Sequence, residues 1–232
     1  MKKNILKIIA VIIVISIAVL GYFVFTGIMQ ENKLKAELTT LDNLVNSENV
    51  DFNKLEEIIE RTVTKGDYAV VEKAFKNYLN DNFENTIKIN DILNDEKITN
   101  LLTIENYKAD GKNFTETKNY IKNTIDSLES CKKNYKDFFT EEKAMSYIND
   151  KGLSGYYINF YKQELVGDIE SIGTDKTVEN SIDEVISLLN ISNEIIEFLA
   201  DNENGWYIEG ENIVFENKAL LDEYNTLTSR LP

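Results

Sequence analysis

The first strong pattern along the chain is an uncharged apolar stretch at residues 8–28. At a rise of ~1.5 Å per residue, a helix of this length spans about 31 Å, which matches the ~30 Å hydrocarbon core of a bilayer. Tyr22, Phe23 and Phe25 lie toward its C-terminal end, where aromatic side chains favour the membrane interface. The pattern predicts a single transmembrane helix at residues 8–28.

Positive charge before this stretch predicts its orientation. Lys2, Lys3 and Lys7 precede or begin it, whereas the charges that follow it nearly cancel. The positive-inside rule therefore makes residues 1–7 a cytoplasmic tip and residues 29–232 an extracytoplasmic domain. A cleaved signal peptide is the alternative, but the stretch is longer than the ~7–15 apolar residues of such signals and ends without an A-x-A site. We favour the retained anchor.

Beyond residue 28, apolar positions recur every three or four residues, as on one face of a helix. Leu34, Leu38, Leu41 and Val45 predict a helix that continues out of the membrane, with a short dimerising stalk as the alternative. The same spacing predicts helices around residues 52–63, 68–87, 98–102, 121–138, 145–148, 156–165 and 177–202. Gly66 is expected to end the first of these, and Thr140 to cap the helix around 145–148.

The pattern changes near the C-terminus. Two β-rich triplets at residues 206–208 and 213–215 flank a loop that contains Gly210 and predict a hairpin near 206–215. Since an isolated hairpin is marginal in water, Trp206 and Phe215 are expected to pack on the helices. A last helix is predicted at residues 217–230. The fold class is thus mainly all-α: an irregular bundle of six to eight helices with one small hairpin, in one domain without internal repeats.

Charge restricts the possible partners. The chain carries a net charge of −15, and residues 8–232 hold 22 basic against 40 acidic residues, a net charge of −18. Such a surface repels nucleic acid, because phosphate binding needs Lys or Arg to displace counterions. A solvated surface is the ordinary interpretation, and a cation-binding role is the alternative. The abundance of Asn, Ile and Lys is typical of an AT-rich bacterial genome.

No motif fixes a reaction, a cofactor or a metal. The chain has no His and a single Cys, Cys131, which falls on the apolar stripe of residues 121–138 and is expected to be buried. Residues 201–205 resemble a calcium loop only superficially, since the Gly stands at the fifth position. We therefore predict no catalytic, cofactor-binding or metal-binding residue and no cofactor.

The most suggestive group of side chains is aromatic and comprises Tyr147, Tyr156, Tyr157, Phe160 and Tyr161. At helical spacing Tyr156 lies over Phe160, and Tyr157 over Tyr161. These rings are a possible partner or ligand surface for a peptide or a glycan. The alternative, which we favour, is that they belong to the core with hydroxyls at its rim.

These observations predict a membrane-anchored, extracytoplasmic binding or scaffolding protein of the cell envelope, without enzymatic activity. Its expected partners are the lipid bilayer, through residues 8–28, and a protein or another component of the envelope, but no nucleic acid. Two alternatives stay open. One is a cell-wall-acting enzyme that uses a pair of carboxylates. The other is a ligand-sensing subunit of a membrane complex.

Overall fold

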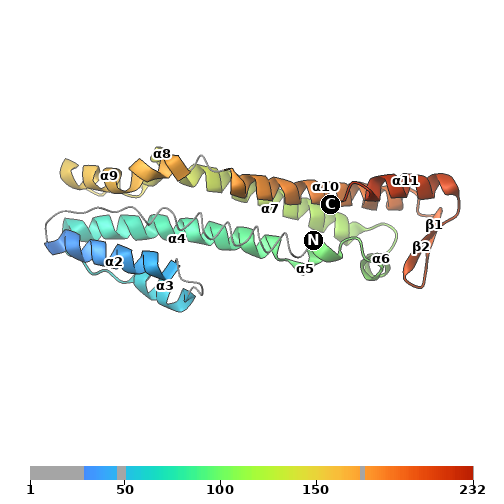
Figure 1. The fold of residues 1–232 in the computed structure, drawn as a ribbon, viewed down its shortest axis with the longest axis horizontal. Coiled ribbons are helices and arrows are strands. Elements are labelled where there is room, and N and C mark those ends of the chain that lie inside the picture. Colours follow the sequence, from blue (N-terminus) through green and yellow to red (C-terminus); the bar gives the residue numbers. More distant parts are fainter. Residues whose placement is uncertain (1–28, 46–50, 173–175, 232) are drawn as a thin grey trace. The chain divides into compact units, whose positions relative to one another are not determined.

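The structure, a computed structural model, describes residues 29–45, 51–172 and 176–231. This part of the chain forms ten helices and one two-stranded antiparallel sheet (Figure 1), which confirms the mainly helical fold with a C-terminal hairpin. The predicted cytoplasmic tip at residues 1–7 and transmembrane helix at residues 8–28 lie outside the described residues. Within the described ranges, no helix is both long and apolar enough to cross a bilayer.

The described residues group into two compact units. We call residues 29–45, 51–88, 133–172 and 176–178 the N-terminal unit, and residues 89–132 and 179–231 the C-terminal unit. The boundary falls within α4 (Asp67–Leu93), within α7 (Thr115–Phe138) and near the start of α10 (Thr177–Asp201).

The N-terminal unit is built around the first part of α4. Figure 1 shows α2 (Met29–Val45) and α3 (Phe52–Glu60) along one side of this helix, with α8 (Glu141–Ser146) and α9 (Gly155–Ile172) on the other. Leu34, Leu38 and Leu41 of α2 are at most 1% exposed, so the predicted apolar stripe faces the core. Thr140 caps α8 as predicted, because its hydroxyl accepts a hydrogen bond from the Lys143 amide at 3.2 Å.

Helix α3 ends earlier than its apolar pattern predicts. Asp51 caps its N-terminus by accepting a bond from the Lys54 amide at 3.1 Å, but the helix stops at Glu60 and not at Gly66. Residue 61 is extended, and the amides of Val63 and Thr64 donate to the carboxylate of Glu72 at 2.9–3.1 Å. A helical backbone at these residues would turn both amides toward its own carbonyls, so the tertiary contact with α4 ends the helix.

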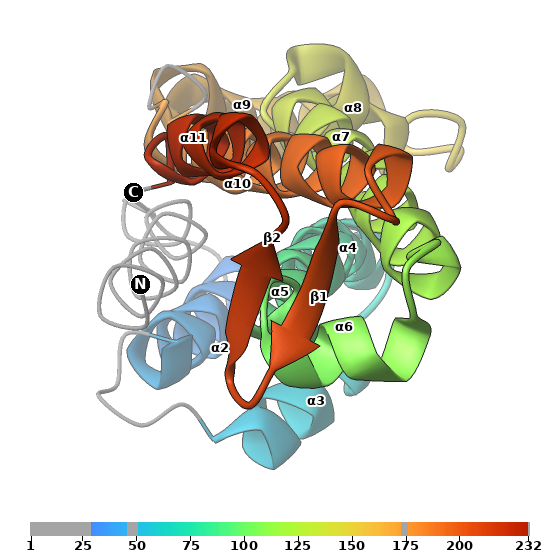
Figure 2. The same cartoon turned by 90° about the vertical axis from the view of Figure 1, so that its right-hand side faces the viewer.

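The C-terminal unit combines helices with the hairpin. Its elements, besides the first part of α7 and most of α10, are α5 (Glu96–Asn100), α6 (Ile104–Asp110), β1 (Trp206–Glu209), β2 (Asn212–Phe215) and α11 (Lys218–Thr228). Trp206 pairs with Phe215 and Tyr207 with Val214, and Gly210 makes the turn at φ +63°. The hairpin lies beside α6 (Figure 2), and Lys108 of α6 donates to the Gly210 carbonyl at 3.2 Å.

Trp206 is the centre of this unit's core, as its predicted packing on the helices requires. Its side chain is 2% exposed, and the indole N–H donates to the Leu199 carbonyl of α10 at 2.7 Å. The ring stacks on Phe114 at 6.1 Å, and the Lys112 ammonium lies 4.9 Å from its centroid. Phe215 is partly buried against the same cluster. Cys131 of α7 is fully buried, as expected.

Replacement of Trp206 by Ala should lower the free energy of unfolding by about 3–5 kcal/mol, because it empties a large core volume and orphans the Leu199 carbonyl. Urea unfolding followed by the circular dichroism of the helices measures the change. Tyr207→Ala is the matched control: this neighbour is 48% exposed, and its loss should cost less than ~1 kcal/mol. Equal effects of the two substitutions would contradict the assigned core.

Candidate functional site

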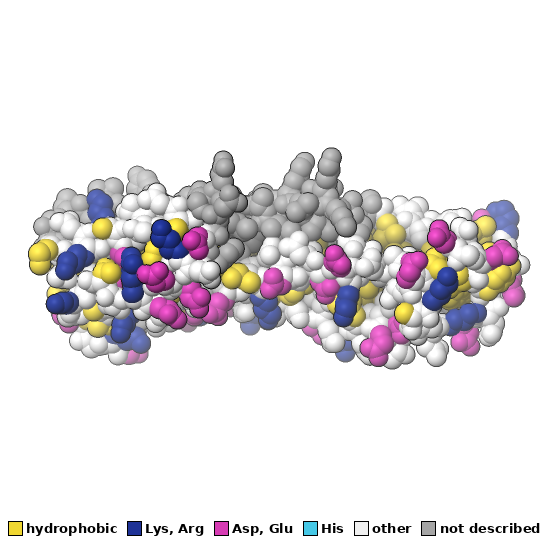
Figure 3. Space-filling view, turned by 90° about the horizontal axis from the view of Figure 1, so that it is seen from below, with side chains coloured by type: hydrophobic (Ala, Val, Ile, Leu, Met, Phe, Trp, Pro, Cys, Tyr) yellow, Lys and Arg dark blue, Asp and Glu magenta, His cyan; other side chains and the backbone are white. Residues whose placement is uncertain are grey.

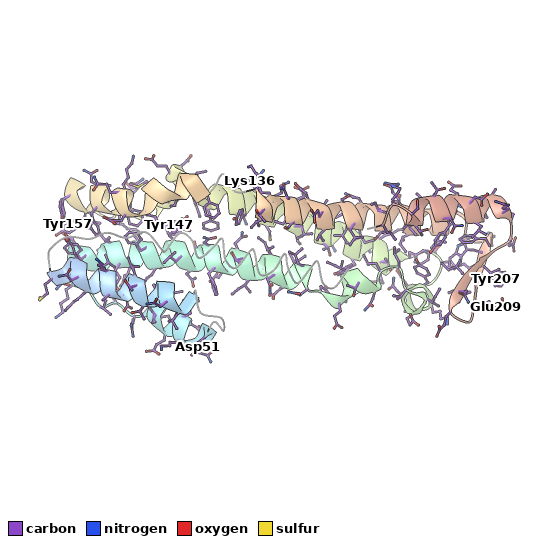
Figure 4. The ribbon with its side chains drawn as sticks, viewed as in Figure 1. Asp51, Lys136, Tyr147, Tyr157, Tyr207 and Glu209 are labelled. Atoms are coloured by element: carbon purple, nitrogen blue, oxygen red, sulfur yellow. The ribbon has the colours of Figure 1, made fainter. Side chains whose placement is uncertain are left out.

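The five aromatic residues singled out in the sequence all lie in the N-terminal unit, but they form two groups. Tyr156, Tyr157 and Phe160 of α9 gather around Tyr68 of α4, whose ring centroid is 5.1 Å from that of Tyr157 and 6.0 Å from that of Phe160. Tyr147 and Tyr161 pack farther along α4. Figure 4 shows Tyr157 and Tyr147 at these separate positions, each on the side of α4 that faces α8 and α9.

The first group surrounds a carboxylate. The hydroxyls of Tyr68 and Tyr156 both donate to Oε1 of Glu31 in α2, at 2.6 and 2.7 Å. Glu31 is 4% exposed, whereas Tyr156 is 54% exposed. Burial, and then the hydrogen bonds with Glu31 and Tyr156, raise the pKa of Tyr68, so this phenol stays a neutral donor. These contacts attach α2 to α4 and α9.

The second group belongs mainly to the core. Tyr161 is fully buried, its ring centroid lies 4.7 Å from that of Phe75 at a tilt of 48°, and its hydroxyl donates to the Ala144 carbonyl at 3.0 Å. Tyr147 is half-buried, and its hydroxyl donates to Oδ2 of Asp81 at 2.5 Å. The five rings therefore do not make one continuous face. Tyr156 and Tyr147 reach the surface, each with its hydroxyl held by a carboxylate, and a role in holding a partner stays a prediction.

Beside Tyr147 lies a groove of about 450 Å³ that the sequence analysis did not find. Its walls come from α4, the end of α7 and α8, and its lining residues are Asp81, Glu84, Asn85, Lys88, Asn134, Asp137, Phe138 and Lys143. The only signal in the sequence is the recurrence of polar side chains at positions 81, 84, 85 and 88, which share one face of a helix. That pattern alone is indistinguishable from an ordinary solvated face.

The second polar feature of the N-terminal unit is a buried network of charges. Lys76 of α4 is 1% exposed, and its ammonium donates to Glu37 at 2.9 Å, to Glu72 at 2.7 Å and to the Arg61 carbonyl at 2.8 Å. Arg61 in turn binds both oxygens of Glu37, at 2.7 and 2.8 Å. Two cations and two anions thus neutralise each other among α2, α4 and the segment after α3.

The network shifts the acidity of its carboxyl groups. Burial alone would raise the pKa of Glu37, but hydrogen bonds from Arg61 and Lys76, with their positive charges, lower it below its ordinary 4.5. Burial likewise opposes ionisation of Glu72, and hydrogen bonds from Lys76, Thr64 and the backbone lower its pKa below the same value. Both groups are therefore carboxylates at neutral pH and hold the network together, a structural role that does not require a ligand.

Charge is distributed unequally between the units. The described residues of the C-terminal unit include twenty acidic and eight basic side chains, a net charge of −12, and those of the N-terminal unit eighteen and fourteen, a net charge of −4. Figure 3 shows Lys and Arg interspersed among Asp and Glu over α2 and α3. The acidity predicted for the whole domain is therefore concentrated in the C-terminal unit.

No family model, curated protein or solved structure matches the chain. Among the described residues, no group of three or more Asp, Glu, Cys or His side chains is placed to hold a metal ion.

Substitution of Lys76 by Met should lower the free energy of unfolding by about 3–5 kcal/mol, because Glu37 and Glu72 would keep their buried charges without the shared ammonium. Urea unfolding monitored by circular dichroism tests this. Lys73→Met, on the exposed side of the same helix, is the control and should change stability by no more than ~0.5 kcal/mol. A Lys76→Met protein as stable as the control would show that the network contributes little.

Acid should weaken the N-terminal unit through the same carboxylates. Because Glu37 and Glu72 have lower pKa values in the folded than in the unfolded chain, their contribution is complete well above pH 4.5 and is lost as the pH falls through the folded values. Urea midpoints measured from about pH 7 to about pH 3 should fall. In Glu72→Gln the urea midpoint should fall less with decreasing pH, because one titrating group is gone. An equally large fall in this variant would show that other groups cause the acid sensitivity.

Proposed function

We propose that this chain is a membrane-anchored, extracytoplasmic binding or scaffolding protein of a bacterial cell envelope, without enzymatic activity. The uncharged stretch at residues 8–28 would be the anchor, and Lys2, Lys3 and Lys7 would keep the N-terminus in the cytoplasm. The two compact units that follow would then both lie outside the membrane.

The acidity of the C-terminal unit is the observation that carries the binding role. Residues 179–231 contain twelve acidic side chains and only two basic ones. Ion pairs join Asp183 to Lys132, Glu194 to Arg230 and Asp222 to Lys218. A field of one sign over a compact surface speeds the encounter with a basic partner and disfavours acidic ones.

Apolar side chains accompany this charge on the hairpin and α11. Tyr207 is 48% exposed and Leu221 is 42% exposed. None of the residues of α11 is fully buried, although Leu220, Tyr224 and Leu227 pack against the core. Figure 3 shows hydrophobic side chains among acidic and basic ones at its right-hand end, where α6 and the hairpin lie. A partner surface with basic and apolar groups fits this combination.

The alternative of a carboxylate-dependent hydrolase receives less support. A general acid of that chemistry needs a raised pKa. The pKa values of Glu37, Glu72, Asp110 and Glu194 are all lowered. Hydrogen bonds or ion pairs cause each decrease, as expected for structural carboxylates.

Cross-linking on intact spheroplasts of the source cell tests the proposal. The full chain with a C-terminal tag is treated with a membrane-impermeant reagent that couples carboxylates to amines. We expect a discrete cross-linked species, and we expect the triple substitution of Glu209, Glu211 and Glu216 by Gln to weaken it about tenfold or more, because three exposed charges of the acidic surface disappear. The matched control replaces Glu56, Glu60 and Glu142, which are exposed on the N-terminal unit, and should retain the species.

Protease added outside the same spheroplasts should remove the tag, while alkaline carbonate should leave the chain in the membrane fraction. A protected tag would invert the proposed orientation, and release into the soluble fraction would make residues 1–28 a cleaved signal. Equal loss of the cross-linked species in both triple variants would show that the C-terminal unit does not select the partner.

A further inference from the structure

The groove beside Tyr147 brings unlike charges together on one concave surface. Lys88, Lys143 and Asp137 line it together, yet none of the three has an ion-pair partner in the part of the chain that the structure describes. Unlike charges that share a concave site without pairing are available to a ligand that carries both signs.

Several of these groups are held in place by their neighbours. The Lys143 ammonium lies 5.0 Å from the ring centroids of both Phe138 and Tyr147. Asp81 accepts the hydrogen bond from Tyr147, and Tyr78 donates to the Phe138 carbonyl at 2.8 Å, which fixes the end of α7 against α4. Positions fixed before binding lower the entropy cost of binding.

The arrangement along α4 gives the groove two different ends. Asp81 and Lys88 line it from the same face of this helix, seven residues apart, which corresponds to ~10 Å along the helix axis. Asp137 lies next to Phe138, and the contacts of Phe138 and Tyr147 place these residues near Asp81. Asp81 and Asp137 therefore lie toward one end, together with the Lys143 ammonium, and Lys88 lies toward the other, one helical turn beyond Glu84.

We propose that this groove binds a short peptide by its two charged termini. Asp81 and Asp137 would receive the α-ammonium group, Lys88 would receive the terminal carboxylate, and the exposed amide of Asn134 would pair with the peptide backbone. An extended chain covers ~3.3–3.6 Å per residue, so ~10 Å corresponds to three residues. A volume of about 450 Å³ is within the range of sites for small ligands.

This site goes beyond the proposed partner surface, because it lies in the N-terminal unit and shares no residue with the acidic C-terminal unit. The peptide site and the acidic partner surface can therefore be tested independently of each other. Substitution of Glu209, Glu211 and Glu216 should leave peptide binding unchanged, and loss of peptide binding in a groove variant should leave the cross-linked species intact.

Isothermal titration of the full chain with trialanine tests the inference. We expect one site, and we expect acetylation of the amino terminus or amidation of the carboxyl terminus to weaken binding tenfold to a hundredfold, since each removes a charge-assisted hydrogen bond. Lys88→Met and Asp137→Asn should each weaken binding of the free peptide to the same extent. Lys73→Met, exposed on the same helix but outside the groove, should bind like the wild type.

Three outcomes would overturn the proposal. The first is that trialanine produces no saturable heat at millimolar concentration. The second is that the capped peptides bind as tightly as the free one, which would exclude recognition of the termini. The third is that Lys73→Met weakens binding as much as Lys88→Met, which would place the binding site elsewhere. Circular dichroism of each variant confirms that the helices are intact.

Discussion

The N-terminal unit depends on one buried ammonium group. Lys76 has three N–H donors and three acceptors, namely Glu37, Glu72 and the Arg61 carbonyl. A cation in the interior is tolerated only when its hydrogen bonds are complete and its charge is balanced, and here both conditions are met. Because the partners come from α2, from the segment after α3 and from α4, satisfying this one group fixes how three parts of the chain are joined. The leucines of α2 supply burial along the same contact, but apolar packing alone would tolerate a shift of register that the ion pairs do not.

Local pattern accounts for the helices and the hairpin. Leu34, Leu38 and Leu41 recur at helical spacing and are buried, and the two triplets around Gly210 pair as a hairpin at the predicted residues. The end of α3 could not be predicted in the same way, since it is decided by Glu72, eight residues beyond Thr64, and not by the neighbouring Gly66. Helix α6 was also missed, because Ile104 and Tyr107 are the only large apolar side chains among its seven residues.

The site residues were harder to predict than the fold, for a related reason. In the sequence, Glu37, Glu72 and Lys76 look like three members of a large set of surface charges, and nothing local distinguishes them. The clustered tyrosines are conspicuous in the sequence. In the structure, however, Tyr161 is fully buried, and the Tyr156 hydroxyl donates a hydrogen bond to Glu31. The groove joins residues of α4 with residues about fifty positions away in α7 and α8, and periodicity carries no information about such pairs. The two units also differ in charge. The N-terminal unit holds a network of two cations and two anions that neutralise each other, whereas the C-terminal unit carries a net charge of −12.

The position of Trp206 has a practical consequence. It is the only tryptophan of the chain, it is enclosed by Phe114 and Tyr107, and a lysine ammonium lies over its ring. Its fluorescence therefore reports on the C-terminal unit alone, while the circular dichroism of the helices averages over both units. Opening of the hairpin would expose the indole to water and shift its emission to longer wavelength, whether or not α2 stays docked in the other unit. Comparison of Trp206 fluorescence with the circular dichroism of the helices would therefore show, without an added label, whether the two units unfold cooperatively.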